Sequence, residues 1–186
     1  MSMFHTHYKK VYQTIFLLSS LLLFTSSLLY AQSNMPNDSY TIITEATNLG
    51  PENPRRSSSM LGRLKQKFYT DGSYENIDDF SVYYTIVAAE AEIHVREGKF
   101  STVYRLFGEL GDTIKPLRTK DDQYASYYYF SKVMILLYKA WGKGGLLEKN
   151  PRYRGEIKAL IEEVKRFNFK EKINQNLVVS HLEQYL

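Results

Sequence analysis

The spacing of apolar residues constrains the fold of this chain more than any other feature. From residue 80 onward, large apolar side chains recur at steps of four and three, the period that gathers them on one face of an α-helix. The first such stripe is Phe80, Tyr84, Val87, Ala91 and Val95. Asp78 or Asp79 is placed to cap the first N–H groups of this helix. No segment shows the sustained alternation of a strand, so the sequence predicts an all-α domain.

A second helix follows Gly98 and completes a predicted hairpin. Its stripe consists of Phe100, Val103, Phe107, Leu110 and Ile114, and Pro116 ends it. Glycine is favoured after a helix because it enters the left-handed conformation without a Cβ clash. The connection at residues 97–99 is too short for anything but an antiparallel pair. Phe107 in this pair and Leu137 in the following helix are expected in the core.

Residues 124–141 are apolar on two sides, which predicts a central helix that packs on two sides. One face holds Tyr124, Tyr128, Ile135 and Tyr138, and the other holds Tyr127, Phe130, Met134, Leu137 and Trp141. The consecutive tyrosines at 127, 128 and 129 point around the helix, so at least two are expected to pack against neighbours. The alternative use of such a ring is to stack on a sugar or a peptide.

Two more helices are predicted at the end of the chain. Asn150 before Pro151 is typical of a helix start, and this helix should run to about residue 167. Asn168 followed by Glu171 resembles a capping box that opens the last helix. The last helix is expected to bury its apolar residues, Ile173, Leu177, Val178 and Leu182.

The first 31 residues have the features of a secretory signal peptide. Residues 1–10 hold two lysines and no acid, an apolar run follows at residues 15–30, and Ala31 marks the expected cleavage site. The alternative is an uncleaved anchor, but a membrane span needs about 20 mainly apolar residues and this run includes several Ser and Thr. We expect no stable span after cleavage. Residues 32–58, broken by Pro36, Pro51 and Pro54, predict an extended leader with one short strand at 40–43, and residues 59–186 predict the helical domain.

Composition narrows the compartment and the partners. The chain has no Cys, which removes disulfides and thiolate sites and favours a bacterial envelope, periplasmic or secreted, over a small disulfide-bonded domain. Its net charge is +4, but Lys9 and Lys10 leave with residues 1–31, so the mature balance is 22 minus 20, or +2. Nucleic acid is therefore not an expected partner.

One segment does concentrate positive charge, at Arg55, Arg56, Arg63, Lys65 and Lys67. Apolar Met60, Leu61, Leu64 and Phe68 lie beside these residues at helical spacing. An amphipathic helix of this kind makes peripheral contact with an anionic membrane, or it docks its apolar face on the rest of the bundle.

Motifs for catalysis or for cofactors are absent from the sequence. His94 and His181 are the histidines after residue 31, and they lack the spacing of a metal site. There is no nucleophile elbow and no phosphate-binding loop, so no catalytic residue, metal or cofactor is expected. A small cell-wall or glycan-processing enzyme that uses paired carboxylates remains the alternative, with Glu90 and Glu97 on one helix face. Carboxylates among lysines are more often the solvated side of a helix.

Residues 87–116 resemble one tetratricopeptide repeat. Ala91 stands where the first helix needs a small residue, Gly98 and Phe100 mark the turn, and Phe107 stands at a large position. Val103, Leu110 and His94 depart from the pattern, and Pro116 is one place late, so an irregular helical bundle is the alternative fold.

The resemblance implies a binding function. Repeats of this family bind a partner in the concave face that the first helix of each pair lines. The residues it implies for that face are Tyr83, Glu90, His94, Tyr127, Lys132 and Lys139. The sequence therefore predicts an exported, non-catalytic helical module that binds a protein or a peptide.

Overall fold

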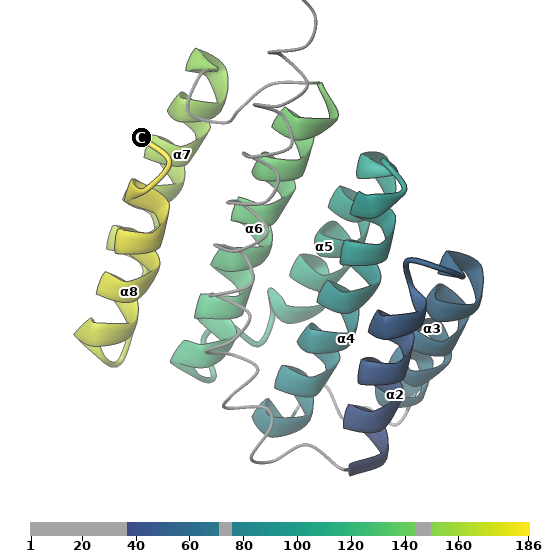
Figure 1. Ribbon diagram of the computed structural model, residues 1–186. Coiled ribbons are helices and arrows are strands. Elements are labelled where there is room, and N and C mark those ends of the chain that lie inside the picture. The colour runs from purple at the N-terminus through teal and green to yellow at the C-terminus, as the bar shows by residue number, and fades with distance from the viewer. Residues whose placement is uncertain (1–36, 71–75, 144–149) are drawn as a thin grey trace, which may run out of the picture.

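The computed structural model describes residues 37–70, 76–143 and 150–186. Regular structure in these ranges is helical throughout, which confirms the all-α prediction (Figure 1). The helices are α2 (Asn37–Leu49), α3 (Pro54–Thr70), α4 (Ile77–Arg96), α5 (Phe100–Ile114), α6 (Asp122–Gly142), α7 (Pro151–Arg166) and α8 (Lys172–Glu183). None of these helices is long and apolar enough to cross a membrane.

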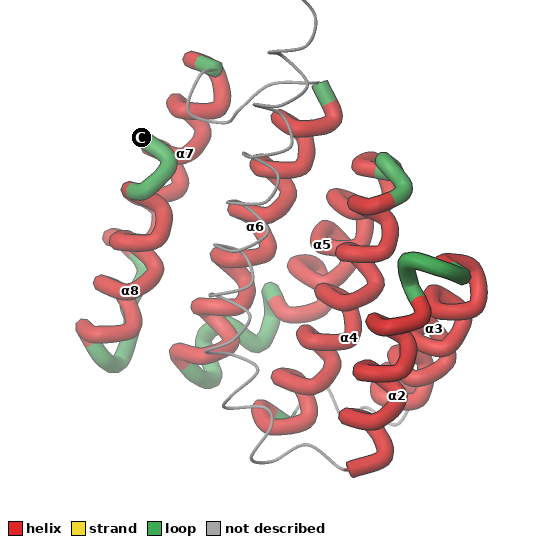
Figure 2. The backbone as a smooth tube through the Cα atoms, viewed as in Figure 1, coloured by secondary structure: helices red, strands yellow, loops and turns green. Residues whose placement is uncertain are grey.

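The helices lie in two layers. Figure 1 shows α2, α4, α6 and α8 in the front layer and α3, α5 and α7 in the back layer, and Figure 2 shows in green the turns within the described residues. Each helix packs against the next along the chain, and the front helices also contact one another in order, α2 with α4, α4 with α6 and α6 with α8. This packing of neighbouring hairpins is compatible with a helical repeat fold.

Local side chains define most helix starts. Asn150 accepts a hydrogen bond from the backbone N–H of Arg152, with Pro151 in the first turn, as the sequence predicts. For α4 the predicted cap is wrong by two residues. Asn76, and neither aspartate, accepts from the N–H of Asp78 at 2.9 Å. The aspartates at 78 and 79 occupy the first turn, where negative charge favours the helix dipole.

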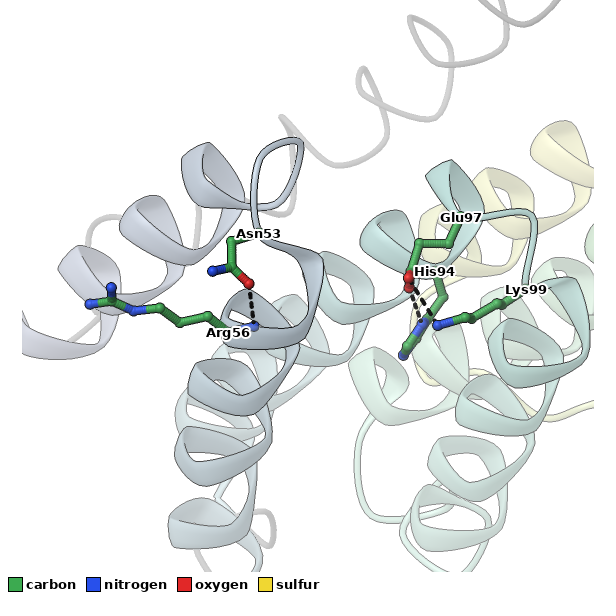
Figure 3. A network of polar contacts seen from close by, with 5 residues as sticks. All are labelled: Asn53, Arg56, His94, Glu97 and Lys99. Carbon is green, nitrogen blue, oxygen red and sulfur yellow. Dashed lines mark hydrogen bonds and ion pairs between the residues drawn. The ribbon is translucent and has the colours of Figure 1, made fainter.

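The turn between α4 and α5 confirms the predicted hairpin. Gly98 has φ of +71°, the left-handed region that glycine enters without strain. The N–H of Lys99 donates to the carbonyl of His94 at 2.8 Å and closes the end of α4. Figure 3 shows this turn, where Glu97 accepts hydrogen bonds from both His94 and Lys99.

The extended leader predicted for residues 32–58 is wrong from residue 37 onward. Helix α2 occupies the segment predicted as a strand, and α3 begins at Pro54 instead of residue 59. Pro51 and Pro54 do not interrupt these helices. Pro51 lies in the loop between α2 and α3, and Pro54 is the first residue of α3. Asn53 caps α3 by accepting from the N–H of Arg56 (Figure 3). Ala46 is fully buried, so α2 belongs to the core. The predicted signal peptide, residues 1–31, lies outside the described residues.

Helix α8 is rotated relative to the sequence prediction. Ile173 and Leu177 are 68% and 56% exposed, whereas the polar Gln175 and His181 are buried with Val178 and Leu182. The predicted capping box is also wrong, since Glu171 precedes the helix without a side-chain cap bond. The polar contacts of Gln175 explain the rotation. Its Nε2 donates to the carbonyls of Val164, Lys165 and Phe167 at the end of α7.

Aromatic rings fill the space between the α4–α5 hairpin and α6. Tyr84 lies with its ring centroid 4.6 Å from Tyr127 and 6.4 Å from Phe107, and Phe107 stacks on Tyr138 at 6.1 Å. Burial raises the pKa of both Tyr84 and Tyr138. Phe107 and Leu137 are both buried, as predicted. The tyrosines at 127, 128 and 129 all pack in or against this core, which supports the packing interpretation of that cluster.

Candidate functional site

The six residues that the repeat resemblance implies do not gather in one place. Three of them turn toward the back layer, each toward a different helix. Lys65 of α3 donates to Glu90 at 2.6 Å, Lys132 donates to Glu163 of α7 at 2.6 Å, and Lys139 lies 5.7 Å from the ring centroid of Tyr104 of α5. These side chains tie the two layers together.

The other three lie in the aromatic core or at a turn. Tyr83 is buried, with its ring centroid 6.0 Å from that of Phe80. Tyr127 is half-buried against Phe80 and Tyr84. His94 lies at the end of α4, where its Nδ1 is 3.3 Å from Glu97 (Figure 3). Of the six, Lys132 alone lines the pocket described next.

A pocket of about 300 Å³ opens between α6 and α7. Its wall is mostly apolar and its rim is charged. It is lined by Lys132, Ile135, Leu136, Glu156, Ala159, Leu160 and Glu163. Residues 132, 135 and 136 share a face of α6, and residues 156, 159, 160 and 163 share a face of α7, because these spacings follow the helical period. The small, exposed side chain of Ala159 leaves the mouth of the pocket open.

The rim of the pocket is electrostatically organised around Glu163. Lys132 donates to it at 2.6 Å, and Arg118 lies 3.9 Å from its other oxygen. Both cations also lie over the ring of Tyr128, at 5.0 Å for Arg118 and 5.3 Å for Lys132. Two cations therefore share the Glu163 carboxylate, and the charged residues that line the pocket itself are Lys132, Glu156 and Glu163.

The size and the wall of the pocket limit what it accepts. Its volume is at the lower end of the range, roughly 300 to 1,000 Å³, of small-molecule sites. A carbohydrate needs hydrogen-bonding groups across its surface, whereas this wall is formed largely by Ile135, Leu136 and Leu160. An apolar side chain from a bound segment suits the space, with the charged rim outside it.

The two carboxylates that line the pocket do not form an acid–base pair. Glu156 and Glu163 have side chains 39% and 41% exposed, and each has a basic partner, Arg152 and Lys132 respectively. A general acid instead needs a desolvated carboxyl. Within the described ranges no three His, Asp or Glu residues group as a metal site.

Glu90 and Glu97, the pair expected for the alternative enzyme, contact different basic residues. Glu90 is held by Lys65, and Glu97 belongs to the turn after α4. The hydrogen bond from Lys99 is the main cause that lowers the pKa of Glu97, with a further contribution from His94. This direction is opposite to the one that acid catalysis at neutral pH requires.

The repeat resemblance implies Lys132, which lines the pocket, but the sequence does not predict the apolar wall. The sequence places Ile135 on a packed face of the central helix and gives no role to Glu163. The spacing of the α7 residues was a usable signal, since it predicts a common face. No local sequence pattern predicts that this face of α7 packs against the face of α6 that carries Lys132.

Comparisons with known proteins do not assign the chain to a family. No family model, no curated protein and no solved structure matches it. The tetratricopeptide resemblance of residues 87–116 thus rests on its own residues and on the packing of the hairpins. The function is inferred from the geometry of the α6–α7 pocket.

Proposed function

We propose that this protein is an exported, non-catalytic helical module that binds a protein or peptide partner through the α6–α7 pocket. The observation that carries the proposal is the pocket itself, an apolar recess of about 300 Å³ between two helices with a charged rim. Grooves between helices are a recurrent place for an apolar side chain of a partner segment. We include in this proposal that the stacked hairpins form a helical repeat fold.

The chemistry of the wall favours an aliphatic or aromatic side chain as the occupant. Burying one such side chain against Ile135, Leu136 and Leu160 contributes about 1.5 to 3 kcal/mol. The charged rim, formed by Lys132, Glu156 and Glu163, orients the polar part of the segment outside the recess. Rim charges contribute to specificity and association rate more than to affinity.

The glycan-processing enzyme receives no support from any particular contact. Its proposed pair, Glu90 and Glu97, is bound to separate basic residues. In a binding module Glu90 is a structural tie between the two layers, and Glu97 stabilises the turn after α4.

The test places a bulky side chain at the mouth of the pocket. Ala159→Phe adds a ring at an exposed position of α7 that lines the pocket, so the fold should be retained. Ser101→Phe is the matched control, since it adds the same ring at an exposed position of α5 away from the pocket. Wild type and both variants are used to capture partners from envelope extract, and bound proteins are quantified by mass spectrometry.

We expect a stoichiometric partner with wild type and with Ser101→Phe. Its recovery should fall by at least about tenfold with Ala159→Phe, which corresponds to the loss of one buried apolar side chain. Equal recovery by all three proteins would show that the pocket is not the binding site. Glycan turnover that Glu90→Gln abolishes would favour the enzyme instead.

A further inference from the structure

Helix α3 carries positive charge without any compensating acid. Its 17 residues include Arg55, Arg56, Arg63, Lys65 and Lys67, and no Asp or Glu. Helix α7 offers a useful comparison. It has five basic residues as well, Arg152, Arg154, Lys158, Lys165 and Arg166, but three acids lie among them, Glu156, Glu162 and Glu163. Charge on α7 is mixed, whereas charge on α3 has one sign.

The structure settles how the apolar side of α3 is used. Leu61, Leu64 and Phe68 are buried in the core, and α3 packs against α2 and α4. The apolar side therefore docks on the bundle, and it is not available to enter a bilayer. Lys65 is also committed, because its ammonium bonds to the buried Glu90.

Four basic residues of α3 remain on its exposed side. Arg55, Arg56, Arg63 and Lys67 are all exposed, and within the described part of the chain none of them has an ion-pair partner. Residues 56, 63 and 67 are separated by seven and four positions, which places them along one face of the helix. Figure 3 shows the Arg56 side chain extending away from the helix and from Asn53. We call these four residues the basic face of α3.

We propose that the basic face of α3 docks the protein on an anionic phospholipid surface. The charges extend from Arg55 in the first turn of α3 to Lys67 in its last turn, a length of about 18 Å at 1.5 Å per residue. A plane of phosphate headgroups meets all of them at once. Tyr69, in the last turn, is 51% exposed, and a tyrosine with an apolar ring and a polar tip suits the headgroup level.

The composition of this surface favours a membrane over other polyanions. Protein interfaces are anchored at a desolvated centre, and the centre of the exposed side of α3 has Ser59 and Gln66 among basic residues, with no large apolar side chain. A single-stranded nucleic acid needs a series of aromatic rings on which bases stack, and Tyr69 is a single ring. The expected binding is electrostatic, reversible and sensitive to salt.

The proposed affinity follows from the number of cations. Each basic residue near an anionic membrane strengthens binding about fivefold. Four residues together give an advantage of about 10² to 10³ over a face without them. At 1 M salt the screening length falls to about 3 Å, so most of this advantage should disappear.

The experiment measures cosedimentation of the exported protein with vesicles. One vesicle type is pure phosphatidylcholine, and the other contains phosphatidylglycerol as about a third of its lipid, a composition that makes it anionic. The α3 variant carries Arg55→Gln, Arg56→Gln, Arg63→Gln and Lys67→Gln. The control carries Arg152→Gln, Arg154→Gln, Lys158→Gln and Arg166→Gln, which removes the same total charge from α7. Circular dichroism checks that both variants are folded.

We expect binding to anionic vesicles alone, a loss of at least about 50-fold in the α3 variant and a change within about threefold in the control. Equal losses in the two variants would mean that total charge, not the basic face, governs binding. Equal binding to both vesicle types would mean that attachment does not depend on anionic lipid, and would overturn the proposal. Tighter binding to a DNA duplex at the same salt would replace the membrane with nucleic acid.

Two further measurements keep the result decisive. If the variant with four substitutions in α3 is unfolded, the single substitution Arg63→Gln replaces it and should weaken binding to anionic vesicles about fivefold. Unchanged binding by Arg63→Gln would refute the proposal. Ala159→Phe should leave vesicle binding intact. Failure of the pocket hypothesis and failure of the membrane hypothesis are therefore distinguished.

Discussion

We expect Asp122 to be the residue that fixes the start of α8 against α6. It is buried at the start of α6, far in sequence from the segment before α8 that it holds. Its two oxygens accept from the N–H groups of Lys170 and Glu171 at 2.8 Å each, and from Nδ2 of Asn174 at 3.1 Å. Burial alone would raise its pKa, but the backbone donors at 171 and 170 and the amide of Asn174 lower it below its usual value.

The cost of removing this carboxylate can be worked from these contacts. A hydrogen bond to a charged group contributes about 1.5 to 3 kcal/mol. The bonds to Asp122 share one carboxylate, so their contributions do not add in full. We expect Asp122→Ala to lower the free energy of unfolding by about 2 to 4 kcal/mol at pH 7. Since the folded pKa is lowered, this contribution is present above the unfolded pKa of about 3.9 and is lost as pH falls through the folded pKa.

Asp121→Ala is the matched control. Asp121 is the adjacent residue and caps its own helix, where it accepts from the N–H of Gln123 at 2.8 Å, so its loss should cost about 1 kcal/mol. Urea denaturation measures both variants, and hydrogen exchange measures the amides at 170 and 171. Only Asp122→Ala should lose protection at those amides. Equal free energies for the two variants, with α8 equally protected in both, would refute the proposed anchor.

Three further changes test the core, the turn and the response to acid. Phe107→Ala should lower the free energy of unfolding by about 3 to 5 kcal/mol in urea, since Phe107 is 1% exposed. Gly98→Ala should cost about 1 kcal/mol because of its positive φ, whereas Gly108→Ala, on an open part of α5, should stabilise by up to about 1 kcal/mol. Burial lowers the pKa of His181 to about 4. The unfolded chain therefore gains its proton first, near pH 6.5, and stability should fall by up to about 3 kcal/mol between pH 6.5 and 4. His181→Phe should flatten that slope in urea titrations at pH 7 and pH 4.5.

The sequence by itself determined the features that depend on neighbours along the chain. The stripe from Phe80 to Val95 predicts α4, Gly98 predicts the turn, and Asn150 with Pro151 predicts the start of α7. A helix with one apolar face, or with two, is encoded by side chains three and four positions apart. The same kind of signal placed Phe107 in the core.

Only the tertiary structure decided the features that depend on distant partners. Residues 37–49 have too little local preference to predict α2, and the helix is stabilised by burying Ala46 and its neighbours in the bundle. Helix α8 buries Gln175 and exposes Ile173 because the carbonyls at the end of α7 need donors. The pocket contains Lys132, which the sequence indicated, and Ala159, which it did not. Residue spacing along the chain determines which residues share a face of α6 or of α7. The packing of these two faces against each other is a long-range contact, and residue spacing does not determine which faces pack together.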